Sequence, residues 1–136
     1  MPHHKRIVLI VEDSEDCSEA LELALHTLKG IEVTIVHSAE DALDRLSKVR
    51  VAAVITDLHL PKMDGLHLVS AMRALKNGST PPVVVVSGDS DPRTPARALE
   101  AGAQAFFSKP YSPAAIRRKL EELLFASEGN GHGSAG

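Results

Sequence analysis

The 136-residue sequence contains one cysteine, has a formal net charge of only −3, and lacks any run of eighteen apolar residues. A single cysteine, Cys17, excludes a disulfide within the chain and fits a reducing cytoplasm, where we expect the protein to reside. Without a long apolar run, no membrane-spanning helix is expected. The start, MPHHKRIVLIV, is too short in its apolar part for a signal peptide. The weak acidic balance disfavours nucleic acid and anionic membranes as direct partners.

Apolar residues gather in five short runs, and helical patterns fill the intervals between them. The runs are Arg6–Val11, Ile31–Val36, Val51–Thr56, Val83–Ser87 and Ala105–Phe107. The first, third and fourth are continuously apolar, which is typical of parallel strands covered on both faces. Between the runs, apolar residues recur at helical spacing, as Leu21, Leu25 and Leu28 do. The alternation predicts an α/β domain in which five βα units surround one parallel sheet.

Local signals mark where two of the helices begin. Ser38 is a predicted N-cap of the second helix, and Asp41 completes a weak capping box. Ser112 is a predicted N-cap of the last helix, with Pro113 at the first helical position. The glycine-rich stretch 127–136 should form a disordered tail outside a domain of residues 5–126.

Polar residues follow the apolar runs at the positions where the predicted strands end. Because parallel strands all end at one edge, where open α/β sheets bind ligands, these residues should lie together. They are Glu12 and Asp13 after the first run, Asp57 after the third, Ser87 at the end of the fourth, and Lys109 after the fifth. Taken singly, Asp13 also fits a helix cap and Asp57 a polar strand end. Asp64 with Gly65 fits either a turn or the start of a helix.

The joint placement of these groups has a chemical meaning that the single residues lack. Carboxylates held close together repel one another, and a hard cation such as Mg²⁺ offsets the repulsion. The lysine adds a positive charge that faces either the aspartate or a phosphoryl oxygen. A carboxylate nucleophile, a cation site, a lysine and a hydroxyl are the groups that phosphoryl transfer uses. The set predicts a phosphoryl-transfer site with Asp57 as the nucleophile.

Four segments carry a likeness to a known family: IVLIVEDSED, VITDLHLPKMDG, VVVVSGDSD and AGAQAFFSKPYS. The chain resembles the receiver domain of two-component response regulators over roughly residues 5 to 126. The resemblance implies a flavodoxin-like, doubly wound parallel sheet of strand order 2-1-3-4-5. It also implies a stand-alone regulator of the chemotaxis or phosphorelay type, or a receiver excised from a larger protein.

The resemblance assigns roles to the residues at the strand ends. Asp57 would accept a phosphoryl group from a phosphohistidine of a sensor histidine kinase or histidine phosphotransfer protein. Ser87 and Lys109 would contact that group, and the Lys109–Pro110 peptide bond would be cis. Asp13 and Asp57 would bind Mg²⁺ or Mn²⁺ directly, and Glu12 would act nearby, often through water. The backbone carbonyl of His59 would be a further ligand.

The resemblance also implies a switch and a set of residues that tune it. The switch would comprise Ser87, Phe106 and Tyr111, with the ring of Phe106 turning inward as Ser87 moves. As a phenylalanine, residue 106 cannot form a hydrogen bond through a phenol. His59 and Asp89 would tune dephosphorylation.

The signal would leave through the face formed by residues 93–126, which would dock on a downstream protein target. A monomer and a phosphorylation-dependent dimer both remain open. No enzyme activity is expected beyond self-phosphorylation and autodephosphorylation. Two alternatives remain: a degenerate receiver that binds partners without phosphorylation, and a haloacid-dehalogenase-type Mg²⁺ phosphatase. The phosphatase would need an acidic residue two positions after its nucleophile, where His59 stands.

Overall fold

The computed structural model describes residues 5–13, 15–75 and 80–129, and within these ranges five parallel strands form one sheet. The strands are β1 (Arg6–Val11), β2 (Ile31–Val36), β3 (Ala53–Asp57), β4 (Val83–Ser87) and β5 (Ala105–Ser108). They alternate with α1 (Glu15–Leu25), α2 (Ala39–Lys48), α3 (Gly65–Arg73), α4 (Thr94–Ala101) and α5 (Pro113–Gly129). The sheet order β2-β1-β3-β4-β5 confirms the predicted flavodoxin-like fold.

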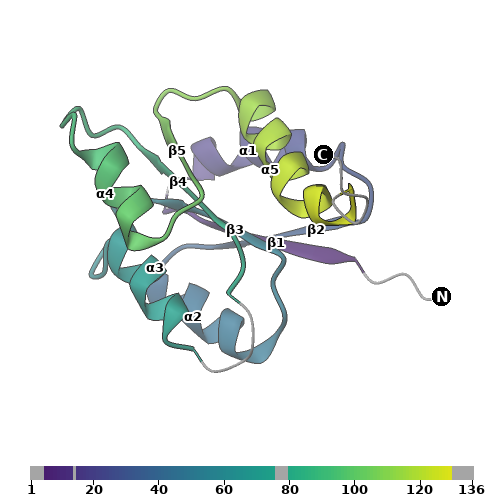
Figure 1. Ribbon diagram of the computed structural model, residues 1–136, viewed down its shortest axis with the longest axis horizontal. Coiled ribbons are helices and arrows are strands. Elements are labelled where there is room, and N and C mark those ends of the chain that lie inside the picture. The colour runs from purple at the N-terminus through teal and green to yellow at the C-terminus, as the bar shows by residue number, and fades with distance from the viewer. Residues whose placement is uncertain (1–4, 14, 76–79, 130–136) are drawn as a thin grey trace.

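The sheet separates two hydrophobic clusters, because successive residues of a strand point to opposite faces. Leu9 and Val11 of β1 pack with α2, α3 and α4, whereas Val8 and Ile10 pack with α1 and α5. Figure 1 shows α1 and α5 on one side of the sheet and α2 and α3 on the other. Strands β3 and β4 are buried along their whole length, which accounts for their unbroken apolar runs. None of the described helices combines the length and apolar composition needed to cross a membrane.

Three of the described helices have an N-cap residue whose side chain accepts a backbone hydrogen bond. The hydroxyls of Ser38 and Ser112 accept hydrogen bonds from the N–H three residues later, at 3.1 and 3.2 Å. These bonds confirm both predicted N-caps. Asp64 is the N-cap of α3, because its Oδ1 accepts a hydrogen bond from the N–H of His67 at 2.8 Å. Each cap satisfies an N–H that the helix itself leaves unpaired.

Several element boundaries differ from the sequence-based expectation. Strand β3 begins at Ala53, two residues after the expected start, and ends at Asp57, one residue beyond the expected end. Asp57 therefore belongs to the strand. Strand β5 likewise ends one residue later than expected, at Ser108. Helix α4 begins at Thr94 and accommodates Pro95 in its first turn. Helix α5 continues to Gly129, since no proline or glycine interrupts it earlier. Residues 127–129 are therefore helical, and the remainder of the predicted tail lies outside the described residues.

Candidate functional site

The polar residues at the carboxyl edge of the sheet converge as the topology requires. Glu12 follows β1, Asp57 ends β3, Ser87 ends β4 and Lys109 follows β5. One carboxylate oxygen from each of Glu12, Asp13 and Asp57 lies within 4.8 Å of the others. The Nζ of Lys109 is 2.7 Å from Oδ2 of Asp57 and 3.7 Å from Oε1 of Glu12. Four strands thus bring three carboxylates, a hydroxyl and an ammonium group to one place.

Asp57 is buried although it is the last residue of its strand, with only 6% of its surface exposed. Each of its carboxylate oxygens has a donor. Oδ2 accepts a hydrogen bond from Lys109, and Oδ1 accepts one from the N–H of His59 at 3.2 Å. Burying a carboxylate costs free energy that a cation and hydrogen-bond donors offset. The carboxylate of Asp57 is therefore held by one ion pair and one backbone hydrogen bond.

Ser87 is fully buried and is held by two hydrogen bonds. Its Oγ accepts from the N–H of Asp89 at 2.9 Å. Its carbonyl oxygen accepts from the N–H of Lys109 at 2.8 Å, which connects the end of β4 to the residue that contacts Asp57. The Lys109–Pro110 peptide bond is cis, as the resemblance implies.

His59 and Asp89 face each other from two different loops. The Nε2 of His59, in the loop after β3, lies 3.6 Å from Oδ2 of Asp89, in the loop after β4. The histidine side chain is 67% exposed and the aspartate side chain 30% exposed. The pair links the loop that follows the candidate phosphoacceptor to the loop that follows Ser87.

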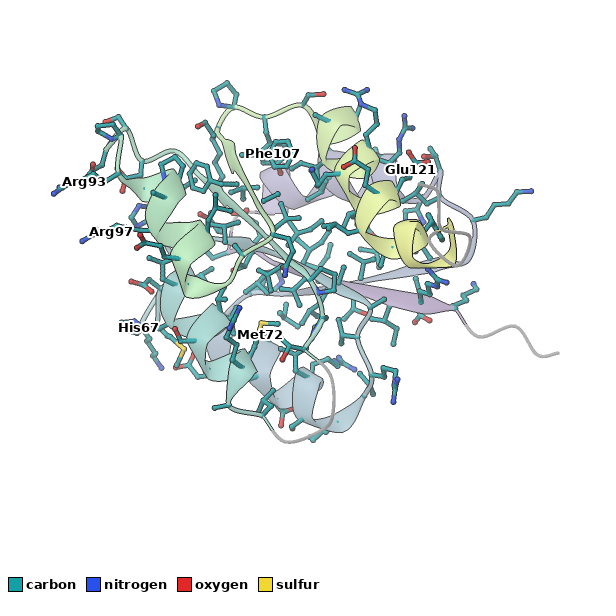
Figure 2. The ribbon with its side chains drawn as sticks, in the orientation of Figure 1. His67, Met72, Arg93, Arg97, Phe107 and Glu121 are labelled. Carbon is teal, nitrogen blue, oxygen red and sulfur yellow. The ribbon has the colours of Figure 1, made fainter. Side chains whose placement is uncertain are left out.

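Phe106 and Tyr111, the two rings assigned to the switch, pack against different hydrophobic clusters. Phe106 is half-buried against the cluster that contains α2, α3 and α4. Phe107 and Tyr111 are half-buried against the cluster that contains α1 and α5. Figure 2 labels Phe107 close to α5. Only Phe106 lies on the side of the sheet that α4 covers, and its role in a switch stays a prediction.

His37 also lies at this edge, although sequence reasoning gave it no role. Its Nδ1 lies 2.9 Å from the backbone carbonyl oxygen of Glu12. Because a carbonyl oxygen only accepts, the ring nitrogen is the donor. The bond ties the end of β2 to the start of the acidic pair. The position of His37 directly after the second apolar run was the available signal.

The three carboxylates fit a hard divalent cation. Glu12 and Asp57 are buried and Asp13 is exposed, so solvent can reach the cluster and supply further ligands. Mg²⁺ and Mn²⁺ prefer carboxylate and water oxygens. This cluster contains no cysteine or histidine side chain, which favours these ions over zinc. The backbone of His59 adjoins Asp57, and the role of its carbonyl as a ligand stays a prediction.

Comparison with known proteins places the chain in a family. Residues 8–121 match the family model of the response regulator receiver domain. The chain is 32% identical over 125 residues to the chemotaxis protein CheY homolog of Campylobacter jejuni strain 81-176, covering 91% of this chain and 96% of that protein. It is 34% identical over 117 residues to the transcriptional regulatory protein PrrA of Mycobacterium leprae, covering 86% of this chain and 49% of that protein.

A solved structure supports the same assignment. It is the receiver domain of a sensor histidine kinase from Pseudomonas aeruginosa PAO1, with a magnesium ion coordinated in its active site cleft. The two chains are 27% identical with a TM-score of 0.77, covering 88% of this chain and 98% of that one. The strand order, the converging strand-end residues and the family match agree. The chain belongs to the family of response regulator receiver domains of two-component systems.

Proposed function

We propose that this receiver accepts a phosphoryl group on Asp57 from a phosphohistidine of a kinase or phosphotransfer protein, in a reaction that depends on Mg²⁺ or Mn²⁺. The observation that carries the proposal is the environment of the Asp57 carboxylate. Lys109 lies 2.7 Å from one of its oxygens, and oxygens of Glu12 and Asp13 lie within 4.8 Å. Three carboxylates this close repel one another, which is unfavourable at a strand end that has no role in binding a cation or a phosphoryl group.

In the proposed reaction a carboxylate oxygen of Asp57 forms a bond to phosphorus as the bond from phosphorus to the imidazole nitrogen breaks. The imidazole leaves with the electron pair of the broken bond. Lys109 neutralises charge on the transferred group, and the hydroxyl of Ser87 donates a hydrogen bond to it. A divalent cation bound by Glu12, Asp13 and Asp57 would supply further charge neutralisation. Hydrolysis of the acyl phosphate by water returns Asp57 to its starting form.

The output of this reaction would be a change of shape in the loop after β4 and in α4. Ser87 is buried at the start of that loop, and a phosphoryl group on Asp57 adds negative charge and acceptor oxygens beside it. Movement of Ser87 toward the new group would let Phe106 change its packing on the α4 side. We propose that residues 93–126 then present an altered surface to a downstream protein.

The test is the intact mass of the protein after incubation with Mg²⁺ and acetyl phosphate. We expect a gain of about 80 Da, the mass of one phosphoryl group, that EDTA prevents. Asp57→Asn should show no gain. Asp64→Asn is the matched control, because it changes a nearby aspartate that caps α3 and keeps an oxygen for the cap.

Two results would contradict the proposal. A gain that persists in Asp57→Asn would place the acceptor elsewhere. No gain at any time, together with no binding of beryllofluoride, which mimics the phosphoryl group, would favour the degenerate receiver that acts without phosphorylation.

A further inference from the structure

The loop between β4 and α4 contains a series of hydrogen bonds that advance two residues at a time. Oγ of Ser87 accepts from the N–H of Asp89, and Oδ1 of Asp89 accepts from the N–H of Asp91. Oδ1 of Asp91 then accepts from the N–H of Arg93. All three bonds are 2.9 Å long. Arg93 is the N-cap residue of α4, so the series runs from the hydroxyl at the candidate site to the start of the helix.

Asp91 accepts the last hydrogen bond of this series, and further hydrogen bonds restrain its position. Its carboxylate accepts from Nε of Arg93 at 3.1 Å and from Nη2 at 3.0 Å. Its backbone carbonyl accepts from the N–H of Thr94 at 3.1 Å. Thr94 is only 3% exposed, so it anchors the first turn of α4 in the interior. Figure 2 shows Arg93 at the start of α4, with Arg97 farther along the same helix.

A loop with such bonds transmits a displacement from one end to the other, whereas a loop without them absorbs it. Each bond closes a small ring and restrains the φ and ψ angles of the residue that it spans. Without these restraints, rotations between residues 87 and 94 would absorb a movement of Ser87. Asp89 has a second restraint, since its other oxygen faces His59 at 3.6 Å. The loop is therefore restrained by contacts at Ser87, Asp89 and Asp91.

We propose that Asp91 is a positioning residue that couples the place of Ser87 to the orientation of α4. The inference rests on the proposed function, because phosphorylation of Asp57 is the event that would displace Ser87. Asp91 makes no contact with Asp57 or Lys109 among the bonds described, so its removal would leave the reacting groups in place. It acts through Asp89 at one end and through the N–H of Arg93 at the other.

The experiment measures whether a change at Ser87 reaches α4, with no phosphodonor present. Backbone amide NMR of the full chain is compared for the wild type, Ser87→Ala, Asp91→Ala and the double variant. In the wild-type background, Ser87→Ala should shift the amides of Arg93 and Arg97. In the Asp91→Ala background the same change should shift them by less than half as much, because the series ends at residue 91.

A conservative variant separates coupling from general damage. Asp91→Asn keeps an oxygen that accepts from the N–H of Arg93, so it should restore more than half of the shift. The same variant removes the negative charge that faces the Arg93 side chain. Asp44→Ala, an exposed aspartate of α2 that pairs with Lys48, should leave the shift unchanged. If Asp91→Ala fails to fold, Asp89→Ala breaks the series one step earlier and serves the same comparison.

Retention of half or more of the Ser87→Ala effect in the Asp91→Ala background would overturn the inference. So would an absence of any effect on Arg97 in the wild-type background. Neither result depends on phosphorylation. Failure of the proposed function would instead appear as the absence of a mass gain with acetyl phosphate, whatever the NMR comparison shows.

Discussion

The backbone of Gly65 lies directly against the backbone of Asp57. A β-carbon at position 65 would be 2.5 Å from the carbonyl oxygen of Asp57 and 3.0 Å from Cα of Leu58. The N–H of Gly65 also donates to the carbonyl oxygen of Leu58 at 2.7 Å. The first residue of α3 thus supports the strand end that carries the candidate phosphoacceptor, and only glycine allows this approach.

Gly65→Ala should therefore destabilise the domain. The atoms in the way are backbone atoms of Asp57 and Leu58, so the strand end must move, at a cost of about 1–3 kcal/mol in the free energy of unfolding. Chemical denaturation measures this loss. Gly88→Ala is the control, because a β-carbon there would lie 3.8 Å from Cβ of Lys109, an ordinary contact. Equal stability of the two variants would show that the close approach at Gly65 is relieved without cost.

Lys109→Met should slow the acceptance of a phosphoryl group. The change removes the positive charge 2.7 Å from Asp57 and leaves the charge of the transferred group without this partner. We expect the rate with acetyl phosphate to fall by about 10²-fold, the usual effect of losing one such group. A time course of intact mass measures the rate. Lys119→Met removes a lysine that pairs with Glu122 on α5 and should leave the rate unchanged. An unaltered rate in Lys109→Met would exclude the lysine from the reaction.

Glu12→Gln and Asp13→Asn should weaken the binding of a divalent cation. Each change removes one negative charge from the cluster of three carboxylates while keeping the size of the side chain. Titration with Mn²⁺, which broadens nearby amide NMR signals, should give dissociation constants raised by about tenfold or more. EDTA should reverse the broadening. Asp64→Asn lies outside the cluster and should bind Mn²⁺ like the wild type. Unchanged affinity in both cluster variants would disprove a cation site at this position.

The contact between Asp91 and Arg93 should weaken at acid pH. The side-chain hydrogen bond from Arg93 is the main cause that holds the pKa of Asp91 below its ordinary value of 3.8, and Arg97 adds a weaker attraction. Because the folded-state pKa is lowered, the contact stabilises the folded state fully above pH 3.8. This stabilisation is lost as the pH falls through the folded-state pKa.

An NMR titration of the Asp91 carboxyl group and the Arg93 amide measures this effect. The midpoint should lie below 3.8, and Arg93→Ala should move it toward that value. Added salt should also raise the midpoint, since the pair is exposed to solvent. Identical midpoints in the wild type and in Arg93→Ala would contradict the assigned cause.

The sequence alone determined the order of the elements and the edge at which the site forms. Continuous apolar runs identified the inner strands, because such strands are covered on both faces. Helical spacing and the caps at Ser38 and Ser112 located the helices between them. The change from apolar to polar residues marked the strand ends at Glu12, Asp57 and Ser87. Parallel topology then required these ends to meet, so the candidate site followed from a local pattern and one general rule.

Only the tertiary structure decided how the residues of the site contact one another. Lys109 lies nearer to Asp57 than to Glu12, and Gly65 packs against Asp57. The bond from His37 to the carbonyl of Glu12 likewise appears only after β2 is placed beside β1. These contacts join segments that are far apart in the chain, and their geometry depends on how helices and strands pack as layers. Local patterns encode burial and period, whereas distances between side chains of different strands are set by the packed fold as a whole.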